Sequence, residues 1–420
     1  MKNLLMLLAT TTLSVATWAQ EETPLSLPEK NALKIDRLEL EMGRAGNLKF
    51  SGYVQGQWQW AQSSGIAAFG DGGSFNATTN NRFMVRRGRV KVSYSVAGIF
   101  SAVIQPDFTE KGVSMKDAYL SVSTRNKAVG GQIGLFDRPF GYEISYSSSL
   151  RESPERSRVF LSLFPGERDL GVMLNLTGGK GWLSNFTLNV GLFNGNGIGT
   201  ETDSQKDFIG RLAYLKKFSS AQVGGAFSYY RGGIINPQEK NFKYLTNQGF
   251  IEQTVSKGQA SPRQYFGIAG QYIQQWGAGT TNIRAEYLWG QQTGILKANN
   301  NPGGTSFGAG SDPLYLRDFR GAYAILVQDI GHSKHSIVLK YDYYDPNTKI
   351  KGDQIGALPG TGAADIAYST FGVGYLFRWN QYIRLMAYYD MVSNERSANL
   401  DGYQGRIKQN VLTARVQFKF

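Results

Sequence analysis

Three basic residues, Arg87, Arg89 and Lys91, recur at every second position of one short stretch of the chain. In an extended strand, alternate side chains leave on the same face, so all three cationic groups would point the same way. Arginine can hold a carboxylate or phosphate through two parallel hydrogen bonds, while lysine acts as a point charge. This pattern predicts a wall that binds anions. The same alternation places further basic residues on equivalent faces: Arg211, Arg284, Lys340, Arg378, Arg384 and Arg415.

A second group of arginines lies between Asp137 and Arg168, a stretch flanked by two short segments with strand character. The stretch is too long for a hairpin turn and too aromatic for a disordered linker. Five arginines and five acids occur in it, together with bulky residues such as Phe160 and Phe164. A loop of this composition must fold against a surface, and in a closed barrel that surface is the inner wall. The predicted constriction residues are Arg138, Arg151, Arg156, Arg158 and Arg168.

Both groups of basic residues have a second interpretation, in which acids cancel their charge. A solvated wall of paired charges would carry no selectivity, and loop arginines in ion pairs would only pin the loop. The sequence leaves these alternatives open. Acids on the strand faces are Glu286, Asp342 and Asp390. Acids near the loop arginines are Glu143, Glu152, Glu155 and Asp169.

The elements that must position these residues are strands. From residue 48 to residue 420, apolar and polar residues alternate in about sixteen segments of about 10–14 residues. Segments of this length can cross a bilayer at a tilt, and they are about twice as long as the strands of an ordinary soluble β-protein. Short connections alternate with long ones, as in a barrel with turns on one rim and loops on the other. The sequence therefore predicts an all-β transmembrane antiparallel barrel, with the long third loop folded inward.

The start of the chain predicts export. Lys2 precedes a short apolar run, Leu4–Val15, so residues 1–19 are expected to be a secretory signal peptide. Residues 20–47 are charged and mixed, and we expect a periplasmic N-terminal segment there. The chain has no cysteine, which excludes disulfides and thiolate metal sites. No apolar run near 18 residues follows the signal, so a spanning helix is not expected.

The formal net charge of +13 limits the expected partners. On an exported protein, such a charge favours small anions or anionic lipid, and nucleic acid is not an expected partner. His332 and His335 lie in a predicted tight turn, and a solvated turn explains them better than a metal site. No catalytic arrangement of serine, histidine and acid is evident. We therefore expect no enzyme activity, no metal and no cofactor.

Several segments resemble one known family when taken in order. They are RFMVRRGRVKVSY, SMKDAYLSV, GQIGLFDRPFGYE, SPERS and FPGERDLGVML, and they lie between Arg82 and Leu174. In this order they resemble the phosphate-selective porin O and P family, and the resemblance extends over about residues 50–420. It implies a trimeric channel of sixteen strands in the outer membrane of a Gram-negative bacterium. It further implies anion selectivity, with phosphate or polyphosphate as the solute.

The leading functional hypothesis is a water-filled, anion-preferring diffusion channel, because a barrel of about sixteen strands is too wide to be filled by its own wall. One alternative is a porin for oligosaccharides or general solutes. A structural or adhesive surface barrel is a further alternative, supported only by loop length. The oligosaccharide alternative requires aromatic residues along the lumen, and the candidates are Tyr53, Tyr119, Tyr230 and Tyr388.

Overall fold

The computed structural model describes residues 34, 47–66, 74–201, 203–299 and 312–420. The predicted signal peptide lies outside this part of the chain, as does most of the predicted periplasmic segment. The chain divides at residue 47, and the account below concerns Leu48–Phe420. No helix in the described part of the chain combines the length and the apolar character needed to cross a membrane.

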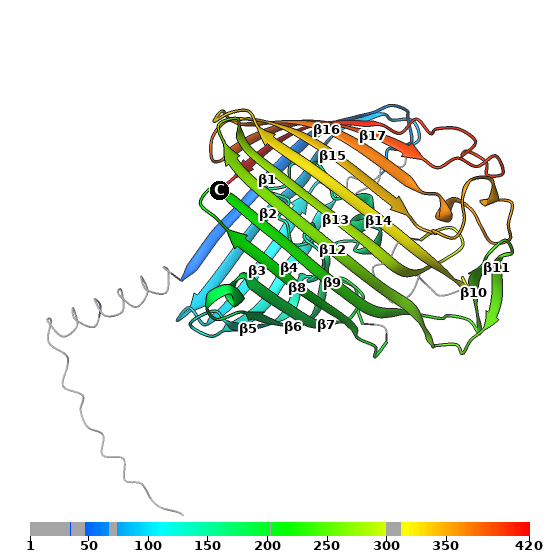
Figure 1. The fold of residues 1–420 in the computed structure, drawn as a ribbon, viewed down its shortest axis with the longest axis horizontal. Helices are drawn as coiled ribbons and strands as arrows, with labels where there is room; N and C mark the ends of the chain where they lie inside the picture. Colours follow the sequence, from blue (N-terminus) through cyan, green and yellow to red (C-terminus); the bar gives the residue numbers. More distant parts are fainter. Residues whose placement is uncertain (1–33, 35–46, 67–73, 202, 300–311) are drawn as a thin grey trace, which may run out of the picture. The chain divides into compact units, whose positions relative to one another are not determined.

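Sixteen strands form one closed antiparallel barrel, as predicted (Figure 1). Neighbours in the barrel are neighbours along the chain, except that β12 pairs with β9. The strands are β1 (Leu48–Ala61), β2 (Asn81–Val96), β3 (Phe100–Thr109), β4 (Gly112–Ser123), β5 (Val129–Asp137), β6 (Arg168–Thr177), β7 (Phe186–Phe193), β8 (Asp207–Lys217), β9 (Ala221–Ile235), β12 (Ala260–Trp276), β13 (Gly279–Gly294), β14 (Leu314–Asp329), β15 (His335–Asp345), β16 (Tyr368–Arg378), β17 (Ile383–Asn394) and β18 (Val411–Lys419).

The first and last strands close the barrel. β1 pairs with β18 from Tyr53↔Lys419 to Ala61↔Val411. Gly52 and Phe420 extend this ladder, because each donates its backbone N–H to the other's carbonyl oxygen, at 2.9 and 3.0 Å. No barrel edge is therefore left open, as hydrocarbon requires of a spanning sheet.

A hairpin outside the barrel was not predicted. β10 (Lys240–Leu245) and β11 (Gly249–Thr254) lie within the long connection between β9 and β12, and β10 also pairs in parallel with the start of β14. The sequence pattern predicted only a long connection over residues 233–262. Tertiary packing explains the hairpin, since its aromatic residues join a cluster built from several loops. The buried members of that cluster are Tyr244, Phe250, Tyr315, Ile350, Ile355 and Ile366.

One irregularity changes which side chains face inward. Between β1 and β2 the register shifts, so that Gln55 pairs with Arg87 but Gly56 pairs with Val85. Arg86 is the extra residue of this β-bulge, and the strand's alternation restarts beyond it. Arg86 and Arg87 consequently both reach the interior, where both contact Glu155.

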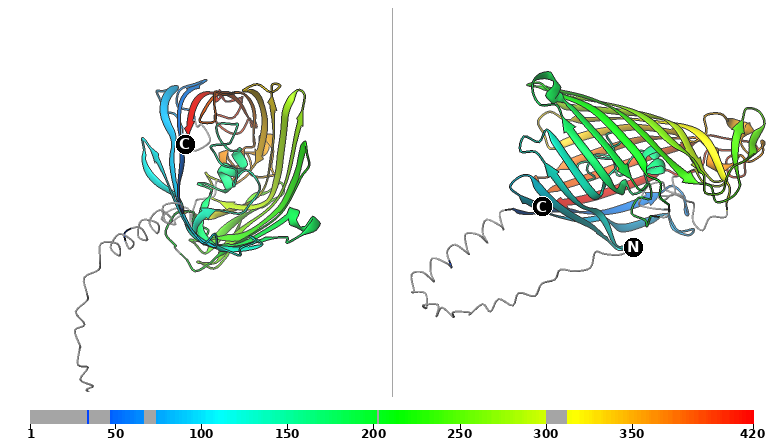
Figure 2. Two further views of the ribbon diagram at one scale, coloured as in Figure 1. Left: turned by 90° about the vertical axis from the view of Figure 1, so that its left-hand side faces the viewer. Right: turned by 90° about the horizontal axis from the view of Figure 1, so that it is seen from below.

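The segment between β5 and β6, residues 138–167, lies inside the barrel, as predicted; we call it the inner loop (Figure 2). It contains one short helix, α2 (Arg158–Leu163). Phe160 packs edge-on against Tyr323 of β14, with ring centroids 6.1 Å apart. Phe164 does the same against Tyr230 and Tyr265, at 5.9 and 5.6 Å. The interior of the barrel is thus partly filled by an apolar core of its own.

Candidate functional site: a solute passage beside the inner loop

Glu155 forms more ion pairs with the barrel wall than the other acids of the inner loop. Its carboxylate lies 2.7 Å from Arg86, 2.9 Å from Arg87 and 3.3 Å from Arg415. Burial alone would raise the pKa of this carboxyl, but Arg86 and Arg87 hold its pKa well below the ordinary value of 4.5. Three wall cations are thus occupied by one loop acid.

Two further wall cations are paired with loop acids. Lys340 of β15 lies 3.0 Å from Glu143, and Arg284 of β13 lies 2.5 Å from Glu152. Burial would raise the pKa of Glu143, but Lys340 and Arg151 lower it overall. The loop is therefore held to the β13–β15 side of the wall as well as to β2 and β18.

Glu286 of β13 fixes the start of the inner loop by accepting backbone hydrogen bonds. The N–H groups of Tyr142 and Glu143 each donate to it at 2.7 Å, and the hydroxyl of Tyr323 donates at 2.7 Å. Gly141 precedes this contact with a φ of 63°, a conformation that favours glycine. A Cβ at that position would meet Glu286 Oε2 at 2.4 Å.

The serine-rich part of the inner loop is hydrogen-bonded to β1, β2 and β17. Tyr53 and Ser148 share a hydroxyl hydrogen bond at 2.5 Å, and Arg89 donates to Ser148 at 3.1 Å. Arg89 also forms an ion pair with Asp107 at 2.9 Å. Arg384 donates to the carbonyl of Leu150 at 3.1 Å. Tyr53 and Arg89 are therefore structural contacts of the loop in this conformation.

Most of the predicted constriction arginines are also bonded within or beside the loop. Arg156 pairs with Glu167, and Arg168 lies 3.0 Å from both Asp117 and Asp137. Arg138 donates to the carbonyls of Pro165 and Glu167 at 3.3 Å. The guanidinium of Arg158 stacks 4.0 Å from the centre of the Tyr368 ring.

Arg151 differs from the other loop arginines. It is 3% exposed, and within the described residues none of its three guanidinium nitrogens has a hydrogen-bond partner. Burial, together with the like charges of Arg156 and Arg87, lowers the pKa of Arg151 to about 9. The side chain is enclosed by protein and does not face an open space.

Two of the predicted pore-lining cations remain unpaired. Lys91 of β2 and Arg211 of β8 have neither an ion pair nor a hydrogen bond to any described residue. The others on the predicted list, namely Arg87, Arg89, Arg284, Lys340, Arg384 and Arg415, all bind the inner loop or a wall acid. Whether any of these residues binds an anion stays a prediction. Arg86 was missed, because no sequence signal marked the bulge that turns it inward.

Two cavities separate the inner loop from the wall on the side of β4–β9 and β12. The loop-side chamber, of about 270 Å³, is lined by Lys91, Tyr119, Gln132, Phe136, Phe140 and Arg211, among others. The turn-side chamber, of about 230 Å³, is lined by Tyr142, Arg211, Leu215, Gly224, Gly225 and Gln271, among others. Both chambers contain Arg211, and Leu215 and Gly224 lie close to the 218–220 turn. Together the chambers extend from the inner loop toward the short-turn rim.

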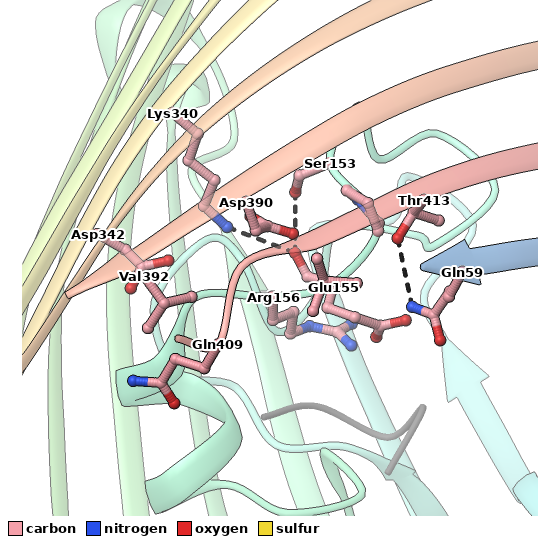
Figure 3. Close-up of a pocket in the computed structure, with 12 residues that line it drawn as sticks. Gln59, Ser153, Glu155, Arg156, Lys340, Asp342, Asp390, Val392, Gln409 and Thr413 are labelled. Carbon is pink, nitrogen blue, oxygen red and sulfur yellow. Dashed lines mark hydrogen bonds between the residues drawn. The ribbon is translucent and has the colours of Figure 1, made fainter. Parts of the chain in front are cut away.

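The opposite side of the interior is closely packed. A cavity of about 40 Å³ lies there, between the inner loop and β15, β17 and β18, and Figure 3 shows the residues that line it. Lys340 reaches across it to the carbonyl of Glu155 at 3.4 Å, and Gln59 donates to Thr413 at 3.3 Å. Asp342 and Asp390 line the same cavity. It has room for little more than a water molecule or two, so the wider space beside Arg211 is the better candidate passage.

The barrel is similar to solved bacterial outer-membrane proteins. It superimposes on OprB of Pseudomonas putida with a TM-score of 0.59 and 11% identity, over 92% of this chain and 97% of that one. For OmpF of Salmonella typhi the TM-score is 0.54 with 10% identity, over 89% and 97%. For OmpT of Vibrio cholerae, in its trimer form, the values are 0.51 and 11%, over 89% and 99%. The fold is that of bacterial outer-membrane porins.

No sequence-family profile and no curated protein matches this chain. The porin fold is therefore established, whereas membership of the phosphate-selective porin O and P family stays a prediction. Of the four tyrosines expected to face the lumen, Tyr119 lines the loop-side chamber, while Tyr53, Tyr230 and Tyr388 are buried. In the described residues, no group of three or more histidines and acids is arranged to hold a metal ion.

Proposed function

We propose that this protein is a porin of the Gram-negative outer membrane, which forms a water-filled diffusion channel that prefers anions. The closed barrel with a long loop inside supports a channel, because the loop narrows the interior without filling it. The single observation that supports the anion preference is that Arg211 and Lys91 have no acidic partner among the described residues. Neither cation has an ion pair or hydrogen bond to any residue that the structure describes, and both line the space that the inner loop leaves open.

The ion pairs of the other wall cations lower the anion selectivity that we expect. Glu155 offsets only one of the three charges of Arg86, Arg87 and Arg415, so these arginines add less net field than their number suggests. Selectivity set by two unpaired cations would be moderate. Rings of charge of one sign select ions in pores, and the effect is screened by salt. Phosphate, which the family resemblance implies, is one of the anions that this proposal includes.

A homotrimer is part of the same proposal. Its support is the trimer form of Vibrio cholerae OmpT, which shares the fold. Apolar side chains cover the outside of β3–β5, where Ile104, Leu120 and Ile133 are 53–62% exposed. This surface suits lipid or a second copy equally, so the oligomeric state must be measured. Native mass spectrometry of the detergent-solubilised protein would do so, and a monomer alone would contradict the trimer.

Reversal potentials in planar bilayers test the channel proposal. Purified protein should produce stepwise conductance, and a KCl gradient should give a reversal potential of the sign expected for anion preference. Phosphate is then titrated against the chloride current. Block at low phosphate would support a phosphate channel, and anion preference without such block would leave a broader anion porin. Cation preference, or no conductance, would overturn the proposal.

A further inference from the structure

The loop-side chamber is lined by both polar and apolar residues. Lys91, Arg211 and the amides of Gln132 and Asn189 contribute polar groups to its lining. Phe136, Phe140, Pro139 and Met173 contribute apolar surface to the same lining. A volume of about 270 Å³ holds a small organic molecule rather than a single ion.

The two cations approach the chamber from different parts of the wall. Lys91 belongs to β2 and Arg211 to β8, with five strands between them in the barrel. Asp117 and Asp137 also line the chamber, each 3.0 Å from Arg168, but the lining has three basic residues, Lys91, Arg138 and Arg211, against these two acids. The unbalanced charge of the chamber is therefore positive.

The apolar residues of the lining favour organic anions over inorganic ones. A bare inorganic anion is strongly hydrated, and it gains nothing when aromatic rings replace part of its water. An organic anion places its charged group beside the cations and its hydrocarbon body against the rings, and burial of that body is favourable. The arrangement of polar and apolar lining thus matches an anion that has both parts.

We propose that the loop-side chamber is a binding site for small organic carboxylates with an apolar body, held by Lys91 and Arg211. This inference rests on the proposed channel function and adds its solute class. The arginines bound to Glu155 then serve to position the inner loop, and they are not ligands of the solute. Gln132 and Asn189 supply additional hydrogen-bond donors to the carboxylate.

Block of single-channel chloride current by benzoate, compared with acetate and inorganic phosphate, tests this site. Benzoate should block at a lower concentration than either of the others. Arg211→Gln and Lys91→Gln should each raise the half-blocking benzoate concentration about tenfold, as expected for a lost charge-assisted hydrogen bond. Arg211→Lys and Lys91→Arg should retain most of the block, because the charge is kept.

Lys216→Gln is the matched control. Lys216 lies on β8, like Arg211, but at the opposite parity, and it is exposed. Benzoate should block this variant at the same concentration as the wild type. Its conductance also shows whether a lysine-to-glutamine change on β8 disturbs folding or insertion. Equal block by phosphate and benzoate, or unchanged benzoate block in both glutamine variants, would overturn the inference while leaving an anion channel intact. A wild-type protein that prefers cations or does not conduct would instead remove the proposed function on which it rests.

Discussion

Glu155 and Glu143 each bring a carboxylate from the inner loop to cations of the wall, and both are buried there. A buried ion pair gains little over an apolar contact, but removal of one partner is costly because the other charge is left uncompensated. The contribution of these pairs is therefore positional. They define where the loop sits in the barrel, and hence which side of the interior remains open.

The pH dependence of the loop follows from these two carboxyls. Folding lowers the pKa of both, so their stabilisation is complete above the ordinary value of 4.5 and is lost as the pH falls through the lowered values. Protonation of these two carboxyls should make the single-channel current noisier only below about pH 5. Recordings over this range, with the thermal unfolding midpoint measured alongside, would check this.

Glu155→Gln provides the comparison for that experiment. Without this carboxylate, Arg86, Arg87 and Arg415 lose their shared partner, at a cost of roughly 3 kcal/mol in unfolding free energy. The variant should be noisy already at neutral pH and should change less on acidification. Glu252→Gln, on the exposed hairpin outside the barrel, should behave like the wild type. A wild-type transition between pH 6 and 7 would contradict the assignment to these carboxyls.

At the level of elements, the inner loop depends on a close approach of its backbone to β13. Gly141 allows this approach, since its Cα lies against Glu286 and Phe160. The β-bulge of β2 has a comparable role on the other side, because it brings Arg86 to the inner loop in addition to Arg87. Both features are local departures from regular backbone geometry, and both bring the inner loop into contact with the barrel wall.

Gly141→Ala tests the approach of the loop to β13. The added Cβ would meet Glu286 Oε2 at 2.4 Å and the Phe160 ring at 3.0 Å, so the hydrogen bonds of Tyr142 and Glu143 to Glu286 should be disturbed. We expect a loss of roughly 1–3 kcal/mol from this crowding, in addition to about 1 kcal/mol for the positive φ. Thermal unfolding measures the loss, and single-channel current reports the loop's position.

Gly166→Ala is a closely matched control for that substitution. Gly166 has a φ of 71°, but a Cβ there has nothing within 4 Å. It should therefore show the backbone cost without the crowding, and its current should resemble that of the wild type. If the two alanine variants were equally stable and conducted alike, the contact of Gly141 with β13 would not be what fixes the loop.

For the whole molecule, closure of the sheet is the condition for residing in a bilayer. Removal of residues 411–420 deletes β18 and leaves unpaired backbone groups along β1 and β17. Each such group exposed to hydrocarbon costs several kcal/mol, so the shortened chain should fail to form a heat-resistant barrel in detergent or a channel in bilayers. Semi-native electrophoresis and bilayer recording measure these two outcomes.

A chain that begins at residue 47 is the control for that truncation, because it keeps every barrel strand. It should refold into a heat-resistant, conducting form. A chain without β18 that still conducted would show that another strand pairing can close the barrel.

Several features could be predicted from the sequence because they depend on local geometry. Alternation at period two follows from the pleat of a strand, and it placed Arg87, Arg89 and Lys91 on one face without any knowledge of the fold. The alternation of short and long connections gave the strand number and the two rims. The length and composition of the stretch from Asp137 to Arg168 predicted a folded loop inside the barrel, since a segment so rich in aromatic residues must be buried.

Only the tertiary structure decided which charges are paired. Glu155 and Arg415 are far apart in the sequence, and no local pattern relates them. The bulge at Arg86 and the hairpin β10–β11 likewise depend on contacts with distant segments. The sequence thus determined a barrel with a basic interior and a loop within it. The structure decided that acids of the loop pair with several wall cations, whereas Lys91 and Arg211 have no partner among the described residues, because ion pairing depends on distances that only the folded chain sets.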